Sequence, residues 1–162
     1  MGQILTDGNT KATFVPAIAS ITAPTVAELT AVGIVALEDT LTDDGLKVEF
    51  DEGTIAGPTL ASVQDFEAPG RSKVNIELTG YRDSVSGSDR MWSVMVRGTV
   101  GYLVVRRGLV VATAYAAAQK VEVYGVTCGE RKKLAPERES QEKFSIKLFA
   151  SSTYSIESTV AA

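Results

Sequence analysis

The chain has 162 residues and a formal net charge of −4 at pH 7, with 44% hydrophobic and 22% charged residues. This composition is typical of one globular domain with a sizeable core and is too apolar for a disordered chain. The negative charge disfavours a protein that grips nucleic acid by neutralising phosphates, and the short apolar runs predict no transmembrane helix. The N-terminus lacks the apolar segment of a secretory signal, so we expect a protein made and kept in the cytosol.

The N-terminal part of the chain predicts an extended segment followed by a short helix. Residues 1–24 contain two prolines, which suit an N-terminal arm or an edge segment rather than the middle of a sheet. Thr25, followed three residues later by Glu28, matches the capping box that begins many helices. We expect a helix of about two turns at most, ended by Gly33, which needs tertiary contacts for its stability.

Two strands are predicted next, separated by a long acidic segment. LKVEF (46–50) alternates apolar and charged residues, as a half-buried strand does. DEGTIAGPTLASVQDFEAPGRS (51–72) is rich in Gly, Pro and acidic residues, which indicates a long loop or an irregular hairpin. KVNIELTGY (73–81) is the clearest strand in the chain, because its apolar side chains alternate with polar ones.

A second short helix is predicted in SGSDRMWSVMVRG (86–98). Ser88 is a suitable N-cap for it. Trp92 would share one face of this helix with Met91 and Met95, and such a stripe favours packing in the core over a ligand site.

The stretch 98–126 is dense in strand-forming residues. Its first two apolar runs, YLVV and LVVATAY, predict a hairpin over 102–115 with an Arg-Arg-Gly loop at 106–108. AYAAAQ (114–119) is too short to nucleate a helix and indicates a strand end or a turn. KVEVYGVT (120–127) alternates again and predicts a further strand.

The C-terminal part adds one charged connection and one or two strands. GERKKLAPERESQE (129–142) predicts a solvated connection, and KFSIKLFA (143–150) alternates as a strand does. Residues 151–162 would add an edge strand or an arm. Together the elements predict a single mainly β domain over 1–162, a β-sandwich or open barrel of about seven or eight strands with one short flanking helix.

The sequence lacks the residues on which most active sites depend. It has no histidine, which removes the commonest general base, the commonest metal ligand and every Ser-His-Asp triad. The single cysteine, Cys128, excludes an internal disulfide and a multi-cysteine metal site. Asp43 and Asp44 precede Gly45 as in a turn and do not form the alternating pattern of a calcium loop. We therefore predict no catalytic residues, no metal site and no cofactor, and hence no enzyme.

The order of these features resembles the major tail tube proteins of long-tailed bacteriophages (siphoviruses), particularly those of phages that infect actinobacteria. The resemblance covers nearly the whole chain and consists of many short cues in one order. The cues are the extended N-terminal arm, APTVAEL (23–29), LKVEF (46–50), the acidic segment, KVNIELTGY (73–81), the helix with Met91 and Trp92, GYLVVRRG (101–108), KVEVYGVTCGE (120–130) and PERESQEKFSIKLF (136–149).

The resemblance implies a β-sandwich with a flanking helix that assembles as a homohexameric ring, with the rings stacked along the phage tail. Each subunit would contribute strands to an inner β-barrel. DNA would pass through its lumen during genome ejection without specific binding, which suits an acidic chain. The implied partners are the tape-measure, tail tip and tail terminator proteins, and no membrane is involved. The protein would be assembled in the host bacterial cytoplasm and become part of the tail of the virion.

Two regions are our candidates for contacts between subunits. The 102–115 hairpin and the strand at 120–126 are candidates for the lumen sheet, and the acidic segment 51–67 and the N-terminal arm for contacts between rings. The candidate inter-subunit residues are Tyr102, Val104, Arg106, Arg107, Leu109 and Val111 in the hairpin and Asp51, Glu52, Phe66 and Glu67 in the acidic segment. At an exposed tip, the two arginines serve either solubility or ion pairs between rings, each worth about 0–1 kcal/mol.

Two other classes of β-rich protein fit the same sequence. One is a capsid decoration or head–tail connector protein, which is also rich in strands and needs no ligand. The other is a small-ligand-binding or carbohydrate-binding β-sandwich, for which Trp92 would be a stacking platform. We prefer Trp92 in the core because Met91 and Met95 share its helical segment.

Overall fold

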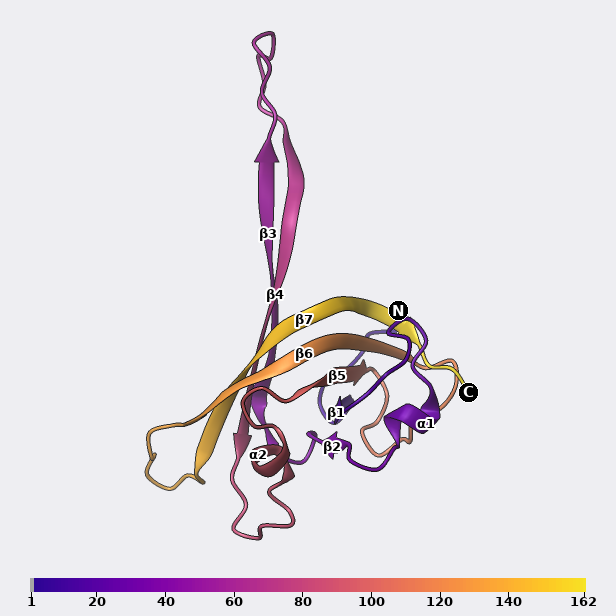
Figure 1. Ribbon diagram of the computed structural model, residues 1–162, viewed down its shortest axis with the longest axis vertical. Coiled ribbons are helices and arrows are strands. Elements are labelled where there is room, and N and C mark those ends of the chain that lie inside the picture. Colours follow the sequence, from indigo (N-terminus) through magenta and orange to yellow (C-terminus); the bar gives the residue numbers. More distant parts are fainter. Residues whose placement is uncertain (1) are drawn as a thin grey trace.

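One long hairpin projects from a curved sheet in the computed structural model, which describes residues 2–162 (Figure 1). Within these residues, seven strands form one antiparallel sheet in the order β2-β1-β5-β6-β7-β4-β3. The elements are β1 (Thr10–Val15), α1 (Val26–Leu29), β2 (Val35–Ala36), β3 (Leu41–Ala56), β4 (Glu67–Tyr81), α2 (Arg90–Val94), β5 (Val100–Arg107), β6 (Lys120–Lys133) and β7 (Lys143–Thr159). The mainly β prediction is confirmed, and the two short helices of the described residues lie in the two segments where short helices are predicted, one more than the single flanking helix of the predicted fold class.

The sheet is covered on both faces around β5 and the first part of β6. Because successive side chains of a strand point to opposite faces, Leu103 lies in one hydrophobic core and Val104 in another. The first core is closed by residues of α2 and β2, and the second by α1 and by the loop that follows β5. This double cover makes the body a three-layered unit, from which the β3–β4 hairpin extends.

The N-terminal segment contains an interior strand, where the sequence predicts an arm or edge segment over 1–24. β1 pairs with β5 along its whole length and with β2 at Thr13 and Phe14. The prolines that suggested an edge lie outside this strand, and Pro16 comes directly after its last residue. At that position a missing N–H interrupts no ladder hydrogen bond. Residue 1 of the predicted arm lies outside the described residues.

The capping box predicted at Thr25 is confirmed. Thr25 Oγ1 accepts a hydrogen bond from the Glu28 amide at 3.3 Å, and Glu28 Oε2 accepts one from the Thr25 amide at 2.8 Å. The helix is shorter than expected, because its four residues end at Leu29, well before Gly33. So short a helix depends on tertiary contacts, and Leu29 supplies them by complete burial in the second core.

α2 supports the interpretation of Trp92 as a packing residue. The two methionines of this segment are fully buried, and the Trp92 ring meets the Phe144 ring edge-on with 5.1 Å between centroids. The guanidinium carbons of Arg82 and Arg131 lie 3.9 Å and 4.3 Å from the centroid of the Trp92 ring. These cations and the aromatic edge occupy the ring surface that a stacked ligand would need.

The start of α2 differs from the prediction. The helix begins after Asp89 and not after Ser88. The Asp89 carboxylate accepts a hydrogen bond from Arg82 Nε at 2.7 Å and so serves as an ion-pair partner rather than as a cap.

The prediction of a hairpin over 102–115 is wrong. β5 ends at Arg107, residues 108–119 form a loop, and β6 begins at Lys120. β5 lies between β1 and β6, so backbone groups along both of its edges are already paired. The strand-forming LVVATAY run therefore finds no open edge of β5 to join.

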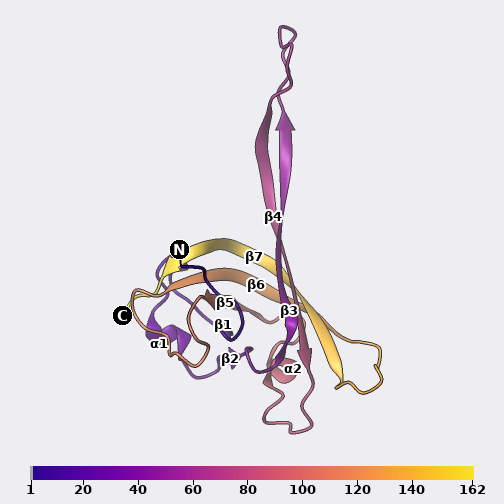
Figure 2. The ribbon, with the colours of Figure 1, turned by 180° about the vertical axis from the view of Figure 1, so that it is seen from behind.

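β6 and β7 are longer than the sequence predicts. β6 continues to Lys133, into the segment 129–142 that was expected to be a solvated connection. β7 joins the predicted strand at 143–150 and most of the predicted edge segment at 151–162 into one strand. Register shifts along the β6–β7 ladder are β-bulges or similar irregularities, which bend and twist a strand. Both strands accordingly arch over the body (Figures 1 and 2).

Candidate assembly surfaces

The arm, residues 51–73 of the β3–β4 hairpin, extends away from the body (Figures 1 and 2). β4 pairs with β7 up to Asn75, and in the described residues the two strands beyond that point pair with each other alone. Every residue from Asp51 to Ala61 is exposed. Of the two possibilities predicted for 51–72, a loop or an irregular hairpin, the structure has the hairpin, with a connection at 57–66.

The end of the arm is apolar. Four large side chains there are exposed, with exposed fractions of 60% for Ile55, 111% for Leu60, 106% for Val63 and 63% for Phe66. The stretch 51–70 also carries four carboxylates and no basic residue. Single exposed apolar residues are ordinary, whereas several of them gathered on one projection mark an interaction surface.

The four candidate residues of the acidic segment all lie on the arm. Phe66 is near the tip, Glu67 begins β4, and Asp51 and Glu52 lie where the arm leaves the body. The Asp51 carboxylate accepts a hydrogen bond from the Asn75 side chain and so ties the start of the arm across the ladder. All four residues are exposed, and their contact with another subunit stays a prediction.

An aromatic cluster anchors the arm to the body. The Phe50 ring lies 5.4 Å from the Tyr154 ring and 6.4 Å from the Tyr124 ring, measured between centroids. The hydroxyls of Ser72 and Tyr154 are 3.1 Å apart, and the Tyr124 hydroxyl donates to Glu122 at 3.0 Å. Burial raises the pKa of Tyr124 above its ordinary value, and the carboxylate of Glu122 raises it further. Sequence reasoning missed this cluster because its members come from three strands whose register no local pattern reveals.

A β-bulge interrupts the arm at Gly53. Beyond the Glu52–Ser72 pair, one residue of β3 lies opposite two residues of β4. A Cβ on Gly70 would lie 2.9 Å from the Gly53 carbonyl oxygen, so the close approach of the two backbones requires glycine there. Bulges strengthen the local twist and bend of a ribbon, and this one lies at the start of the distal arm.

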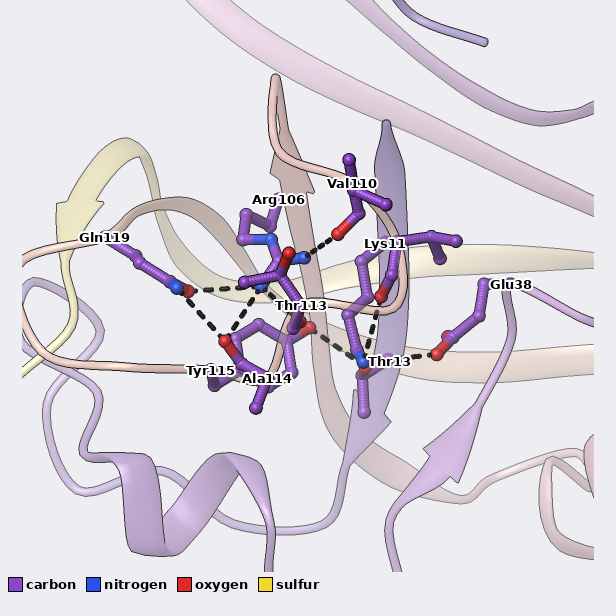
Figure 3. A network of polar contacts seen from close by, with 10 residues as sticks. Lys11, Thr13, Glu38, Arg106, Val110, Thr113, Ala114, Tyr115 and Gln119 are labelled. Atoms are coloured by element: carbon purple, nitrogen blue, oxygen red, sulfur yellow. Dashed lines mark hydrogen bonds and ion pairs between the residues drawn. The ribbon is translucent and has the colours of Figure 1, made fainter. Parts of the chain in front are cut away.

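Arg106 is fully buried, although the sequence predicts it at an exposed hairpin tip. Its guanidinium lies inside the 108–119 loop, surrounded by acceptors (Figure 3). Nη1 donates to the carbonyls of Thr113 at 2.8 Å and Ala114 at 3.3 Å. Nη1 also donates to Gln119 Oε1 at 3.2 Å, and Nη2 donates to the Val110 carbonyl at 2.9 Å. The side chain therefore organises the loop instead of contacting solvent.

A second set of contacts joins the same loop to β1 (Figure 3). The hydroxyls of Tyr115 and Thr13 are 3.0 Å apart in the interior. Lys11 Nζ donates to the Val111 carbonyl at 3.4 Å and lies 3.5 Å from Glu38 Oε1. Burial raises the pKa of Tyr115, so this phenol is neutral and available for the hydrogen bond with Thr13.

The loop in turn holds the N-terminal residues 4–9. The amide of Gly108 donates to the Asn9 carbonyl at 2.9 Å, and the amide of Val111 donates to the Gly8 carbonyl at 2.8 Å. Asn9 Nδ2 closes the segment on itself by donating to the Leu5 carbonyl at 3.2 Å. The N-terminal segment before β1 is thus bound to the turn after β5.

These contacts bring together a second exposed apolar surface, which we call the N-loop patch. Its members are Ile4, Leu5, Leu109 and Val110, with exposed fractions of 75%, 69%, 40% and 59%. Ile4 lies directly over Gly108, because its Cγ2 is 3.0 Å from the position that a Cβ would take there. The patch combines the N-terminal segment with a loop more than 100 positions later, so the sequence alone could not reveal it.

The other candidate residues of the predicted hairpin differ in accessibility. Val104 is fully buried in the second core, and Tyr102 is half-buried against it. These two side chains therefore have little or no surface available for contact with another subunit. Arg107 is exposed, and its Nε pairs with Glu122 Oε1 at 2.8 Å. Val111 is half-buried. Leu109, in the N-loop patch, remains exposed with Arg107.

The second face of the sheet is open over β3, β4 and β7. Along these strands, residues of the first core such as Ile76 and Leu148 alternate with residues that point the other way. In one row across this open face, Lys47, Glu77 and Lys147 lie opposite one another. The charged residues of the open face are Lys47, Lys73, Lys143, Lys147, Glu49, Asp51 and Glu77.

The described residues contain neither a cluster of metal-ligating side chains nor an exposed thiol. Within 2–162, no group of His, Cys, Asp and Glu side chains is arranged to hold a metal ion. Cys128 is buried, and burial raises the pKa of its thiol to about 11, which keeps it protonated at neutral pH. Among these residues, no helix has the length and apolar character needed to cross a membrane.

Comparison with known proteins identifies the family of this chain. A family model described as phage tail tube protein matches residues 1–162. A solved structure, the virion of a native gene transfer agent particle, is similar with 14% sequence identity and a TM-score of 0.47, over 76% of this chain and 97% of that chain. No curated protein matches the chain in sequence. Because the family model covers the whole chain, this protein belongs to the phage tail tube protein family and is a structural component of the virion tail, not an enzyme.

Proposed function

We propose that this tail tube protein forms hexameric rings that stack into a tube, and that the tube is the conduit for ejection of the genome into the host. The observation that carries the proposal is the arm, a two-stranded ribbon with four large exposed apolar side chains at its end. An isolated two-stranded ribbon is marginally stable at best in water. Contacts with other subunits would supply the missing stabilisation. The number six and the passage of DNA are taken from the resemblance to siphovirus tail tube proteins.

We assign the arm to the contact between successive rings. At about 3.3 Å per strand residue, the chain from Asp51 to Leu60 can carry the tip up to about 30 Å beyond the body. With this reach, Phe66 and Glu67 would contact a neighbouring subunit, while Asp51 and Glu52 would stay near the body that bears them. Arg107 is the last residue of β5 and Leu109 lies just after it, and both are exposed. They are candidates for the surface that the arm of a neighbouring subunit contacts.

We infer that the open face of β3, β4 and β7 lines the lumen. The stretch 102–126, our candidate from the sequence, is disfavoured because the chain itself covers both faces of the sheet there. The open face carries four lysines and three carboxylates, so its formal charges sum to +1, whereas the whole chain has a net charge of −4. A wall on which opposite charges nearly cancel attracts a passing polyanion weakly, which suits a conduit without specific DNA binding.

Open sheet edges support closure of the ring. β2 and β3 are the two edge strands of the described sheet. An exposed edge invites pairing with another chain, because its N–H and C=O groups are unpaired. Pairing between edges of neighbouring copies would satisfy these groups and build a continuous barrel from successive subunits. The proposed partners of this assembly are the tape-measure protein, around which the tube would polymerise, and the tail tip and tail terminator proteins at its ends.

Electron microscopy of the purified protein tests the proposal. We expect rings with six-fold symmetry and tubes of uniform bore, either from the protein alone or on addition of the tape-measure and tip proteins. A protein that stays monomeric at high concentration with these partners present would contradict the proposed assembly.

Shortening the arm separates assembly from folding. Replacing residues 54–69 by an Asn-Gly turn, which favours a two-residue hairpin, removes the distal arm and leaves both hydrophobic cores complete. We expect this variant to unfold cooperatively at nearly the temperature of the natural protein and to form no stacked tubes. Tubes of normal length from the shortened protein would exclude the arm as the contact between rings.

A further inference from the structure

The loop at 108–119 consists of sequence that favours a strand but is held in another conformation. Leu109–Tyr115 reads LVVATAY, with β-branched and aromatic residues at four of its seven positions. In the folded subunit the run takes turns and irregular conformations between β5 and β6. The left-handed backbone of Gly108, with a φ of 83°, turns the chain away from β5 at the start of the loop.

Arg106 donates hydrogen bonds to backbone carbonyls of the loop, which in a strand would accept hydrogen bonds from a neighbouring strand. Its guanidinium donates hydrogen bonds to the carbonyl oxygens of Val110, Thr113 and Ala114, all within 3.3 Å. Its other acceptor is the neutral side chain of Gln119, and Nε is buried with no hydrogen-bond partner among the described residues. A buried cation with neutral partners is expensive to desolvate, so its presence indicates a role other than general stabilisation.

The loop is hydrogen-bonded to the N-terminal segment. The amides of Gly108 and Val111 donate to the carbonyls of Asn9 and Gly8, so residues 4–9 follow the backbone of the loop. All four members of the N-loop patch lie on these two connected segments. The position of the patch is therefore linked through these hydrogen bonds to the loop that Arg106 contacts.

We propose that Arg106 is a positioning residue for assembly, which holds the loop so that the N-loop patch is presented in one conformation to a second copy of this chain. The inference rests on the proposed function, since it requires that subunits associate. A second copy is the occupant because a tube of this family is built from repeated subunits and the patch is apolar, exposed and distinct from the arm. Heterologous contacts between two different surfaces of one chain generate closed rings or open filaments.

Release of the loop has a specific consequence. Without the guanidinium, LVVATAY becomes an apolar segment with free carbonyls, and both edges of the neighbouring β5 are occupied. Such a segment pairs with edges of other chains in uncontrolled registers. Arg106 thus prevents irregular association as well as presenting the patch.

Arg106→Met tests the holding role, because methionine keeps an apolar stem and removes every donor. We expect the amides of Gly108 and Val111 to exchange hydrogen at least about tenfold faster, since several hydrogen bonds from a charged donor are lost. We also expect irregular aggregates in place of uniform tubes. Arg107→Met is the matched control, because it removes an exposed guanidinium that pairs with Glu122, and its exchange at these two amides should be unchanged. Unchanged exchange and normal tubes from Arg106→Met would overturn the inference.

Val110→Asp tests the patch without disturbing the hold, because Arg106 binds the carbonyl of Val110 and the side chain is 59% exposed. We expect natural exchange rates at Gly108 and Val111 together with loss of tubes, and this result is available even if Arg106→Met fails to fold. Val32→Asp, at a fully exposed valine outside the patch, should assemble normally. Tubes from Val110→Asp at the concentration that suffices for the natural protein would refute the patch. Failure of the natural protein to assemble under any condition would instead refute the proposed function, and the exchange measurement on unassembled subunits would still test the hold.

Discussion

Replacing both Leu60 and Val63 by serine is expected to prevent stacking and to leave the subunit folded. Both side chains are fully exposed, at 111% and 106%. Surface substitutions of this kind usually change the free energy of unfolding by less than about 0.5 kcal/mol. In a contact between rings the same side chains would be buried, and burial of each is worth about 1.5–3 kcal/mol. The double variant should therefore lose about 3–6 kcal/mol for each arm contact, or about two to four orders of magnitude in the association constant.

Two measurements decide this prediction. Thermal unfolding followed by circular dichroism should give a Tm close to that of the natural protein. Sedimentation velocity and negative-stain microscopy over a concentration series should show tubes only at concentrations at least about a hundredfold higher, by the same conversion. Val32→Ser is the matched control, because Val32 is 102% exposed and lies outside the arm. Tubes from the double variant at the natural concentration would refute the assignment of the arm tip to the contact.

Three further predictions concern the folded subunit. Gly101→Ala places a Cβ 2.9 Å from the Cε2 atom of the buried Phe14 ring, so overpacking should lower the free energy of unfolding by about 1–3 kcal/mol in denaturant titrations, and an equally stable variant would contradict this packing. Hydrogen bonds from the Thr25 and Ala19 backbone amides lower the pKa of Glu28, so its contribution to the stability of α1 is complete above the ordinary pKa of 4.5 and is lost as pH falls through the lower folded pKa. Glu28→Gln should remove this fraying of the helix in acid, as measured by hydrogen exchange of its amides. A pH dependence identical in both proteins would exclude the Glu28 carboxylate as the source of the fraying. Burial raises the pKa of Cys128 to about 11, so iodoacetamide at pH 8 should alkylate the thiol only after denaturation, whereas rapid labelling of the folded protein would show that this part of β6 opens.

Features that depend on neighbouring residues could be predicted from the sequence. The capping box at Thr25 joins residues three positions apart, so the start of α1 was found correctly. Alternation over 73–81 and 120–127 located the centres of β4 and β6, because one side of each strand faces a core. The end of β4 at Tyr81 and the start of β6 at Lys120 match the prediction. The start of β4 and the end of β6 were missed, since pairing with a long neighbour extends a strand past the point where its own alternation stops.

Features that depend on distant partners could not be predicted. Arg106 looked like the tip of a hairpin because its neighbours favour strands, yet it is fully buried. Its burial follows from the pairing of β5 with both β1 and β6, a fact of topology that no local pattern contains. The candidate residues on the arm are all exposed, as a run rich in acidic and glycine residues favours, and their contact with another subunit stays a prediction.

By itself, the sequence determined the class of this protein: a mainly β domain with neither the histidine nor the cysteine pairs that chemistry or disulfides require, and a chain-long resemblance to the family that was then found. Those properties depend on composition and on short-range alternation. Only the tertiary structure decided that residues 51–73 form a projecting arm, that one face of β3, β4 and β7 is open, and that a buried arginine holds a strand-forming run as a loop. The physical reason is that each of these features depends on which strand edges and faces are already occupied, and their occupants come from remote parts of the chain.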